Sequence, residues 1–159
     1  MNDFVEKQLK EIDSSINRGE YKKATTYLRS ISTQSKKERA VMPEVSLLFG
    51  KIADSQSEYA GALNFYNKAL SESVSLGYNN GEGKSLRRIG SIHSKKGKYS
   101  DALKCFSDAL RIFRKISNKA EEGGVYNNIG TIFAIQGKAD EARHHFKNCQ
   151  KAISCRYQH

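Results

Sequence analysis

Two short stretches of the chain carry side chains suited to recognising an anion or a peptide. Arg87-Arg88 stands directly before an Ile-Gly pair, and forty residues later Asn127-Asn128 stands directly before another. A guanidinium can form paired hydrogen bonds with a carboxylate or a phosphate. A carboxamide offers a donor and an acceptor, which match the two polar groups of a peptide unit. We therefore expect charge recognition at Arg88 and peptide-backbone recognition at Asn128.

An internal repeat positions these two pairs. When the chain is shifted by 40 residues, glycines, small residues and large residues fall on residues of their own kind. The aligned sets are Gly50, Gly90 and Gly130; Ile52, Ile92 and Ile132; Ala62, Ala102 and Ala142; and Tyr66, Phe106 and Phe146. Repeats of this length indicate stacked units, because a single unit cannot bury its apolar face alone.

A fourth, weaker copy lies upstream of these three. Its members stand 38 residues before their counterparts in the next copy, and Ile12 takes the place of the glycine. These members are Tyr21, Ala24, Leu28 and Ile31. The approximate repeats are therefore 2–36, 40–76, 80–116 and 120–156, and we expect them to form a single array over residues 1–159.

Each copy divides into two segments with apolar residues at helical spacing. Glycines interrupt three of the copies between the segments, where they suit the left-handed turn that ends a helix: Gly19, Gly97 and Gly137. Pro43 is expected in the first turn of its helix, where its missing N–H costs little. No useful length of sequence alternates with the period of a strand. The sequence predicts an all-α fold of about four antiparallel helix hairpins.

On these residues the chain resembles the tetratricopeptide repeat family. The shared marks are the three aligned glycines, Tyr59 and Tyr99 after the turn, and the aligned alanines and aromatic residues. The period resembles a longer-helix subclass that includes the LGN/Pins adaptors, rapsyn and Rap-type bacterial regulators. The segment 127–133 is close to the N-L-G-N-x-Y motif of that subclass. Two departures are the lack of a Trp that opens a repeat and of a proline that closes one.

The resemblance implies a right-handed α-solenoid whose first helices line a concave groove, while the second helices line the convex side. In resembling adaptors, an Asn directly before the apolar-Gly pair binds the backbone of an extended peptide. Carried onto this sequence, the peptide-binding groove comprises Lys51, Lys84, Arg87, Arg88, Ser91, Asn127, Asn128 and Thr131.

Composition narrows the function further. The formal net charge is +10 and the pI is about 9.5, which favours acidic peptides, nucleic acid or an anionic surface as partners. The sequence contains no Gly-rich phosphate loop, no paired-carboxylate motif and no Cys–His arrangement of known spacing, so neither catalysis nor a cofactor or metal is predicted. Three cysteines without a C-x-x-C spacing are expected to be free thiols: Cys105, Cys149 and Cys155.

The sequence is expected to belong to a cytoplasmic protein, with a nuclear one as the alternative. No apolar run reaches membrane-spanning length, and the first residues lack the layout of a signal peptide. The function expected is a non-enzymatic adaptor that binds an acidic peptide in the groove. One alternative is a basic helical-repeat protein that binds RNA. Another is a self-associating scaffold, because the last helix, 140–157, has no polar capping helix after it and Ile153 is left exposed to form a homodimer.

Overall fold

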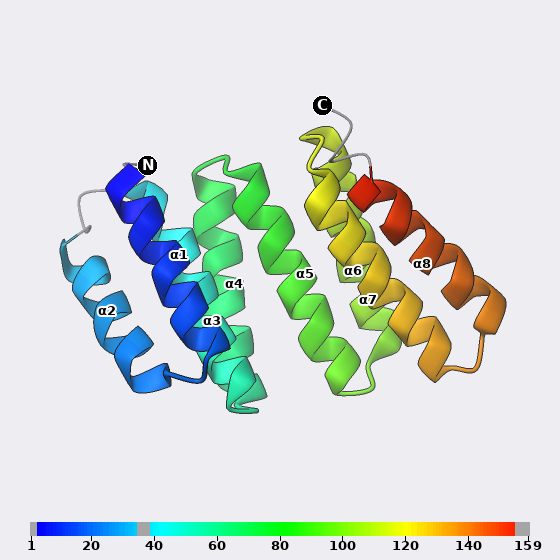
Figure 1. The fold of residues 1–159 in the computed structure, drawn as a ribbon, viewed down its shortest axis with the longest axis horizontal. Helices are drawn as coiled ribbons and strands as arrows, with labels where there is room; N and C mark the ends of the chain where they lie inside the picture. The colour runs from blue at the N-terminus through cyan, green and yellow to red at the C-terminus, as the bar shows by residue number, and fades with distance from the viewer. Residues whose placement is uncertain (1–2, 35–38, 155–159) are drawn as a thin grey trace. The chain divides into compact units, whose positions relative to one another are not determined.

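The computed structural model describes residues 3–34 and 39–154, and this part of the chain is all-α (Figure 1). It contains no strand, which confirms the predicted fold class. The elements are α1 (Asp3–Asn17), α2 (Tyr21–Gln34), the short 3-10 helix η2 (Arg39–Val41), α3 (Met42–Ser55), α4 (Tyr59–Ser75), α5 (Asn79–Lys95), α6 (Tyr99–Lys115), α7 (Lys119–Ile135) and α8 (Ala139–Ser154). None of these helices is long and apolar enough to span a bilayer.

The chain divides into two compact units, Met1–Gly81 and Glu82–His159, and each is described by itself. The first unit holds α1 to α4, and the second holds most of α5 together with α6 to α8. The single array predicted over residues 1–159 stays a prediction.

The turns within the hairpins follow the predicted glycines. Gly19, Gly97 and Gly137 have φ angles of +79°, +73° and +75°, as expected for left-handed helix ends. In the hairpin of α3 and α4 the same conformation falls on Ser57, whose φ is +62°. Pro43 lies in the first turn of α3, as predicted. Three of these four turns therefore follow from the local preference of glycine for a positive φ. At the fourth, Ser57 adopts a conformation that serine does not favour.

In the first unit, the core joins α1, α2 and α3. Its buried residues are Leu9, Ile12, Ile16, Ala24, Leu28, Ile31, Val41, Val45, Leu48 and Ile52. Polar contacts cross the same unit. The Lys51 ammonium lies 2.6 Å from the Asp13 carboxylate, and Ser46 Oγ donates to Glu72 Oε2 at 2.8 Å.

The core of the second unit explains the aligned glycines. A Cβ atom on Gly90 would lie 2.7 Å from Cε1 of Phe106, and one on Gly130 would lie 2.7 Å from Cε1 of Phe146. Real side chains do not approach so closely, so each glycine lets an aromatic ring of the next helix rest on helix backbone. The rest of this core comprises Ala102, Ala109, Leu110, Phe113, Val125, Ile129 and Ile132.

Candidate functional site

The second unit places most of the predicted groove residues on α5 and α7. Lys84, Arg87, Arg88 and Ser91 recur at spacings of three, one and three residues, so they share one side of α5. This side of α5 contacts α7, where the other predicted residues lie. One of them, Asn128, is hydrogen-bonded to Ser91 of α5. The site is therefore built on two rigid helices rather than on a loop.

Arg87 is already neutralised within the protein. Its Nε atom lies 3.0 Å from Glu121 Oε2 on α7, and both side chains are largely covered, with 18% and 22% of their surfaces exposed. The guanidinium also lies against Gly124, where a Cβ would be 3.7 Å from Nη1. A partly buried pair of this kind is screened less by salt than a surface pair. Arg87 thus fixes the register of α5 and α7, and Glu121 compensates its positive charge.

Asn128 and Ser91 form the second link between these helices. Asn128 Nδ2 donates to Ser91 Oγ at 3.2 Å, and Ser91 Oγ donates to the Arg87 carbonyl oxygen at 3.0 Å. The amide oxygen of Asn128 accepts no hydrogen bond from a described residue, and the side chain is half-buried. Asn128 is therefore oriented by Ser91 with its acceptor still available.

Arg88 retains its charge for a ligand. The side chain is half-buried on α5 and has no hydrogen bond or ion pair with any other residue in the described ranges. Ser91 follows it by three residues on the same side of the helix, so Arg88 lies next to the Ser91–Asn128 link. An unpaired guanidinium beside a positioned carboxamide can bind a carboxylate and a peptide group together.

The other predicted residues are placed less favourably. Lys51 belongs to the first unit, where its ammonium pairs with Asp13 and only 17% of its side chain is exposed. Asn127 and Thr131 are exposed on α7, but the Thr131 hydroxyl donates to the Asn127 carbonyl oxygen at 2.9 Å. Lys84 is half-buried one turn before Arg88. The residues that carry the site are thus Arg88, Ser91 and Asn128.

Sequence reasoning missed the acids that pair with two of the predicted cations. Glu121 stands six residues before Asn127, which is the residue aligned with Arg87, and Asp13 stands 38 residues before Lys51. The second offset equals the spacing of the first two repeats, so it was a usable signal. The charges of a single helix do not reveal an ion pair with a residue of another helix, and both of these pairs join two helices.

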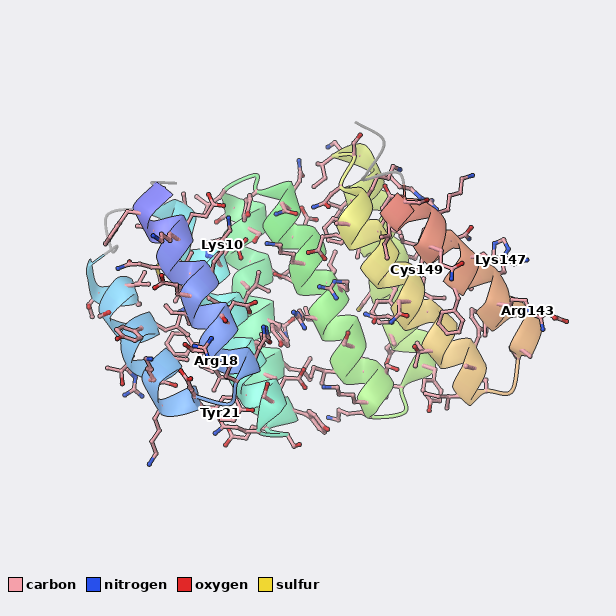
Figure 2. The ribbon with its side chains drawn as sticks, in the orientation of Figure 1. Lys10, Arg18, Tyr21, Arg143, Lys147 and Cys149 are labelled. Atoms are coloured by element: carbon pink, nitrogen blue, oxygen red, sulfur yellow. The ribbon has the colours of Figure 1, made fainter. Side chains whose placement is uncertain are left out.

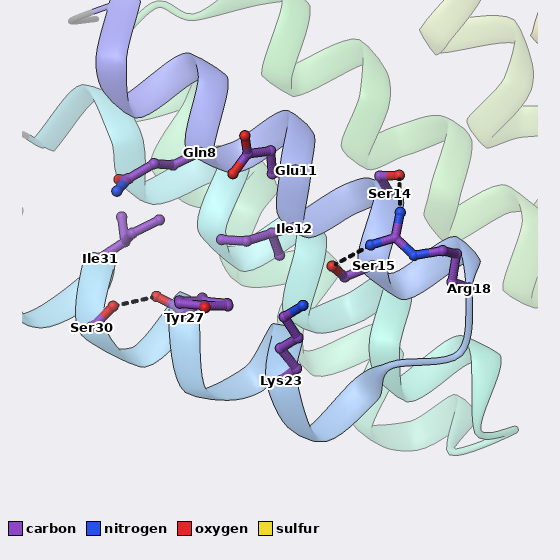
Figure 3. Close-up of a pocket in the computed structure, with 10 residues that line it drawn as sticks. All are labelled: Gln8, Glu11, Ile12, Ser14, Ser15, Arg18, Lys23, Tyr27, Ser30 and Ile31. Carbon is purple, nitrogen blue, oxygen red and sulfur yellow. Dashed lines mark hydrogen bonds between the residues drawn. The ribbon is translucent and has the colours of Figure 1, made fainter.

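A separate hollow of about 320 Å³ lies between α1 and α2 in the first unit (Figure 3). Its lining is mostly polar and comprises Gln8, Glu11, Ile12, Ser14, Ser15, Arg18, Lys23, Tyr27, Ser30 and Ile31. The Arg18 guanidinium donates to Ser14 Oγ at 2.8 Å, to Ser15 Oγ at 3.2 Å and to Glu20 Oε1 at 2.9 Å. The hydrogen bond from Arg18 lowers the pKa of Glu20. Because the protein itself engages this guanidinium on three sides, the hollow offers little to an anionic ligand.

A ring cluster covers the side of α7 that faces α8. His145 stacks on Phe133 with ring centroids 5.3 Å apart, and the Tyr126 ring lies 6.1 Å away. Burial, and secondarily the neighbouring His144, lowers the pKa of His145 below its usual value of 6.5. The folded protein therefore favours the neutral imidazole at this position.

We expect this imidazole to make the second unit less stable in mild acid. Below pH 6.5 the unfolded chain takes up the proton first, so the free energy of unfolding falls until pH reaches the lowered pKa of the folded state. The His145→Phe variant keeps the ring stacking and removes the titration. Urea midpoints at several pH values should fall less between neutral and mild acid in this variant than in the wild type. Equal slopes in both proteins would contradict the assignment.

The cysteines and histidines do not gather into a metal site in the described ranges, where no group of three His, Cys, Asp or Glu side chains could hold an ion. Cys105 and Cys149 are free thiols, and burial raises the pKa of Cys105. Cys155, the third predicted free thiol, lies outside the described residues.

Comparison with known proteins supports the repeat. Residues 81–152 match the tetratricopeptide repeat family. The fold is similar to the crystal structure of BtubC from P. vanneervenii, with a TM-score of 0.77 and 18% identity over 93% of this chain and 61% of that one. It is also similar to aspartyl phosphate phosphatase F from Bacillus subtilis, with a TM-score of 0.82 and 19% identity over 98% of this chain and 42% of that one.

A third similar structure is MamA, with a TM-score of 0.63 and 17% identity over 98% of this chain and 81% of that one. No curated protein sequence matches the chain. The chain spans less than two thirds of the BtubC and phosphatase structures, so these similarities support the fold alone. Helical repeats of this kind typically serve as non-catalytic scaffolds for binding proteins. Residues 81–152 therefore match the tetratricopeptide repeat family, and the fold of the chain is similar to solved helical-repeat structures.

Proposed function

We propose that the second unit is a protein-interaction module that binds an extended acidic segment along α5 and α7. The observation that carries the proposal is Arg88, which is half-buried without an ion-pair partner among the described residues. Leaving a charge partly desolvated is costly unless a ligand compensates it, so such a residue is a candidate contact. The acidic character of the ligand follows from this guanidinium and from the net charge of +10.

Asn128 supplies the second contact. Its amide oxygen faces no donor among the described residues, and its NH2 group is held by Ser91. A peptide N–H can donate to that oxygen while a carboxylate of the same segment meets Arg88. Arg87 takes a different role, because its pair with Glu121 holds the two helices in register. In this proposal Arg88 binds a carboxylate of the segment and Asn128 binds its peptide backbone.

We expect Arg88→Ala and Asn128→Ala each to weaken peptide binding without unfolding the chain. The probe is a fluorescein-labelled decapeptide of Asp and Glu with Gly and Ser spacers, titrated by fluorescence anisotropy. Loss of a hydrogen bond to a charged group is worth about 1.5–3 kcal/mol, so Arg88→Ala should weaken binding by about 10- to 100-fold. Asn128→Ala should weaken binding by about fivefold, because its contact is neutral.

The matched control is Arg111→Ala on α6, whose side chain is 75% exposed. This variant removes the same charge and should leave affinity within about twofold, since exposed pairs contribute little. Circular dichroism of each variant checks that the helices persist. Unchanged peptide binding in Arg88→Ala and Asn128→Ala would exclude this site. Tight binding of poly-U RNA with a steep salt dependence, together with no peptide binding, would instead assign the protein to RNA.

A further inference from the structure

A shallow hollow of about 580 Å³ lies on α8 and the end of α7. It contains none of Arg88, Ser91 and Asn128. It is lined by Ala134, Gly137, Ala139, Ala142, Arg143, Phe146, Lys147 and Gln150. Its floor is apolar, two of the eight lining residues are cations and none is an acid. Phe146 and Ile153 on the same helix have 36% and 44% of their surfaces exposed. Figure 2 labels Arg143 and Lys147 along α8.

The preceding hairpin shows what kind of element fits such a face. Apart from the exposed Ser107, the residues of α6 that align with this side of α8 at the 40-residue offset are Tyr99, Ala102, Leu103, Phe106 and Leu110. All of them belong to or pack against a core cluster that includes Val125, Ile129 and Ile132 of α7. Phe106 is fully buried there and Leu110 is 8% exposed. One helix, α7, therefore covers this face of α6.

Four aligned positions differ between the two faces, and one of them places Gln150 where α6 has Leu110. Ala139 replaces Tyr99, which removes a ring and opens the hollow beside Phe146. Arg143 replaces Leu103, and Lys147 replaces Ser107, so cations rim the hollow. Arg143 pairs with the exposed Asp140 at 3.2 Å, a contact of little strength, and Lys147 has no ion pair or hydrogen bond with another described residue.

The first hairpin lacks this chemistry. At the 38-residue offset, Glu11 and Ser14 of α1 stand where α3 carries Phe49 and Ile52. Its polar hollow holds an arginine that is already hydrogen-bonded within the protein. A polar face suits contact with water, whereas the apolar floor on α8 suits contact with another element.

We propose that this face of α8 is a docking surface for an acidic amphipathic helix of a partner protein. A bulky apolar residue of that helix enters the hollow above Ala139 and Ala142. Its acidic residues meet Arg143 and Lys147 at the rim. The occupant is not a second copy of this face, because a two-fold pairing would place one set of cations against the other.

The probe for this surface is a labelled synthetic peptide of about 18 residues, or five helical turns. Leu and one Phe occupy one side of its helix, and Glu residues flank them. A counterpart carries Lys in place of every Glu. We expect the full chain to bind the acidic peptide and to bind the basic counterpart at least about tenfold more weakly, because the rim is positively charged.

Two variants test the hollow and the rim separately. Ala139→Tyr restores the residue found at the aligned positions of α4 and α6, so it is compatible with the fold and fills the hollow. Lys147→Glu inverts one rim charge. Each change should weaken binding of the acidic peptide by about tenfold. The control, Lys104→Glu, makes the same charge change at an exposed position of α6 and should leave affinity within about twofold.

Equal affinity of the wild type, Ala139→Tyr and Lys147→Glu for the acidic peptide would overturn the proposal. So would a dimer of the chain in sedimentation experiments that Ala139→Tyr dissociates, because the face would then bind a second copy. The titrations are repeated in the Arg88→Ala background, which removes the proposed charge contact on α5, and the losses caused by Ala139→Tyr and Lys147→Glu should persist there. The outcome then does not depend on the peptide site on α5 and α7.

Discussion

The Phe106→Ala variant is expected to lose about 3–5 kcal/mol of unfolding free energy, while Phe146→Ala loses about 1–2 kcal/mol. Both phenylalanines lie over a glycine of the preceding helix at equivalent places in the repeat. Phe106 is fully buried beneath α7, whereas Phe146 has 36% of its surface exposed. Truncating the enclosed ring leaves a cavity as well as removing apolar contact. Truncating the half-open ring removes contact alone.

Urea unfolding followed by circular dichroism measures this difference. Because the two variants share the residue type, the helix position and the neighbouring glycine, their contrast isolates the covering helix. The loss expected for Phe106→Ala is comparable to the whole stability of a small domain, so a partly unfolded protein at zero denaturant also agrees with the prediction. Similar midpoints for Phe106→Ala and Phe146→Ala would show that α7 does not seal the core as the structure indicates.

The second large effect is expected from the glycines beneath these rings. Gly90→Leu should destabilise the protein by about 3 kcal/mol or more, since a Cβ there would lie 2.7 Å from the Phe106 ring and 3.1 Å from Cys105 Cβ. Phe106 is enclosed on every side and cannot rotate away, so the helices must separate. Leucine is a better helix former than glycine, so a loss of stability would not come from helix propensity.

Gly130→Leu is the matched variant for this second prediction. Its new side chain meets the ring of Phe146, which can turn toward solvent because part of it is already exposed. We expect this variant to lose at most about 1 kcal/mol, since the gain in helix propensity offsets much of the strain. Thermal melts of the two variants should therefore differ by several degrees. A Gly130→Leu variant as unstable as Gly90→Leu would mean that Phe146 is held as firmly as Phe106.

The packing of the glycines against the aromatic rings also supports the two proposed binding surfaces. The glycine and aromatic residues pack α5 on α6 and α7 on α8. Beside this packing, Arg87 of α5 reaches Glu121 of α7 and Asn128 of α7 reaches Ser91 of α5. The proposed peptide site thus depends on a packing frame that contains none of its own contact residues. The exposed ring of Phe146 belongs to the same frame, but no described helix covers it, and it is there that the proposed docking surface lies.

The sequence by itself determined the helices, the turns and the residues that form the core. Helical periodicity and the turn preference of glycine act over a few neighbouring residues, so Gly97 and Phe106 could be assigned from their places in the repeat. Ser57 and Ser117 were exceptions, because serine seldom adopts a positive φ, and both do so in the turns after α3 and α6.

Only the tertiary structure decided which polar residues remain available. The sequence predicted Lys51, Arg87 and Arg88 all to line a groove, but Lys51 pairs with Asp13 and Arg87 pairs with Glu121. Each partner comes from another helix, at least 34 residues away in the chain. Coulomb attraction depends on the distance between the charged atoms, and the packing of the helices sets that distance. For the same reason two aligned phenylalanines differ in burial, since a neighbouring helix covers Phe106 and leaves Phe146 half-open.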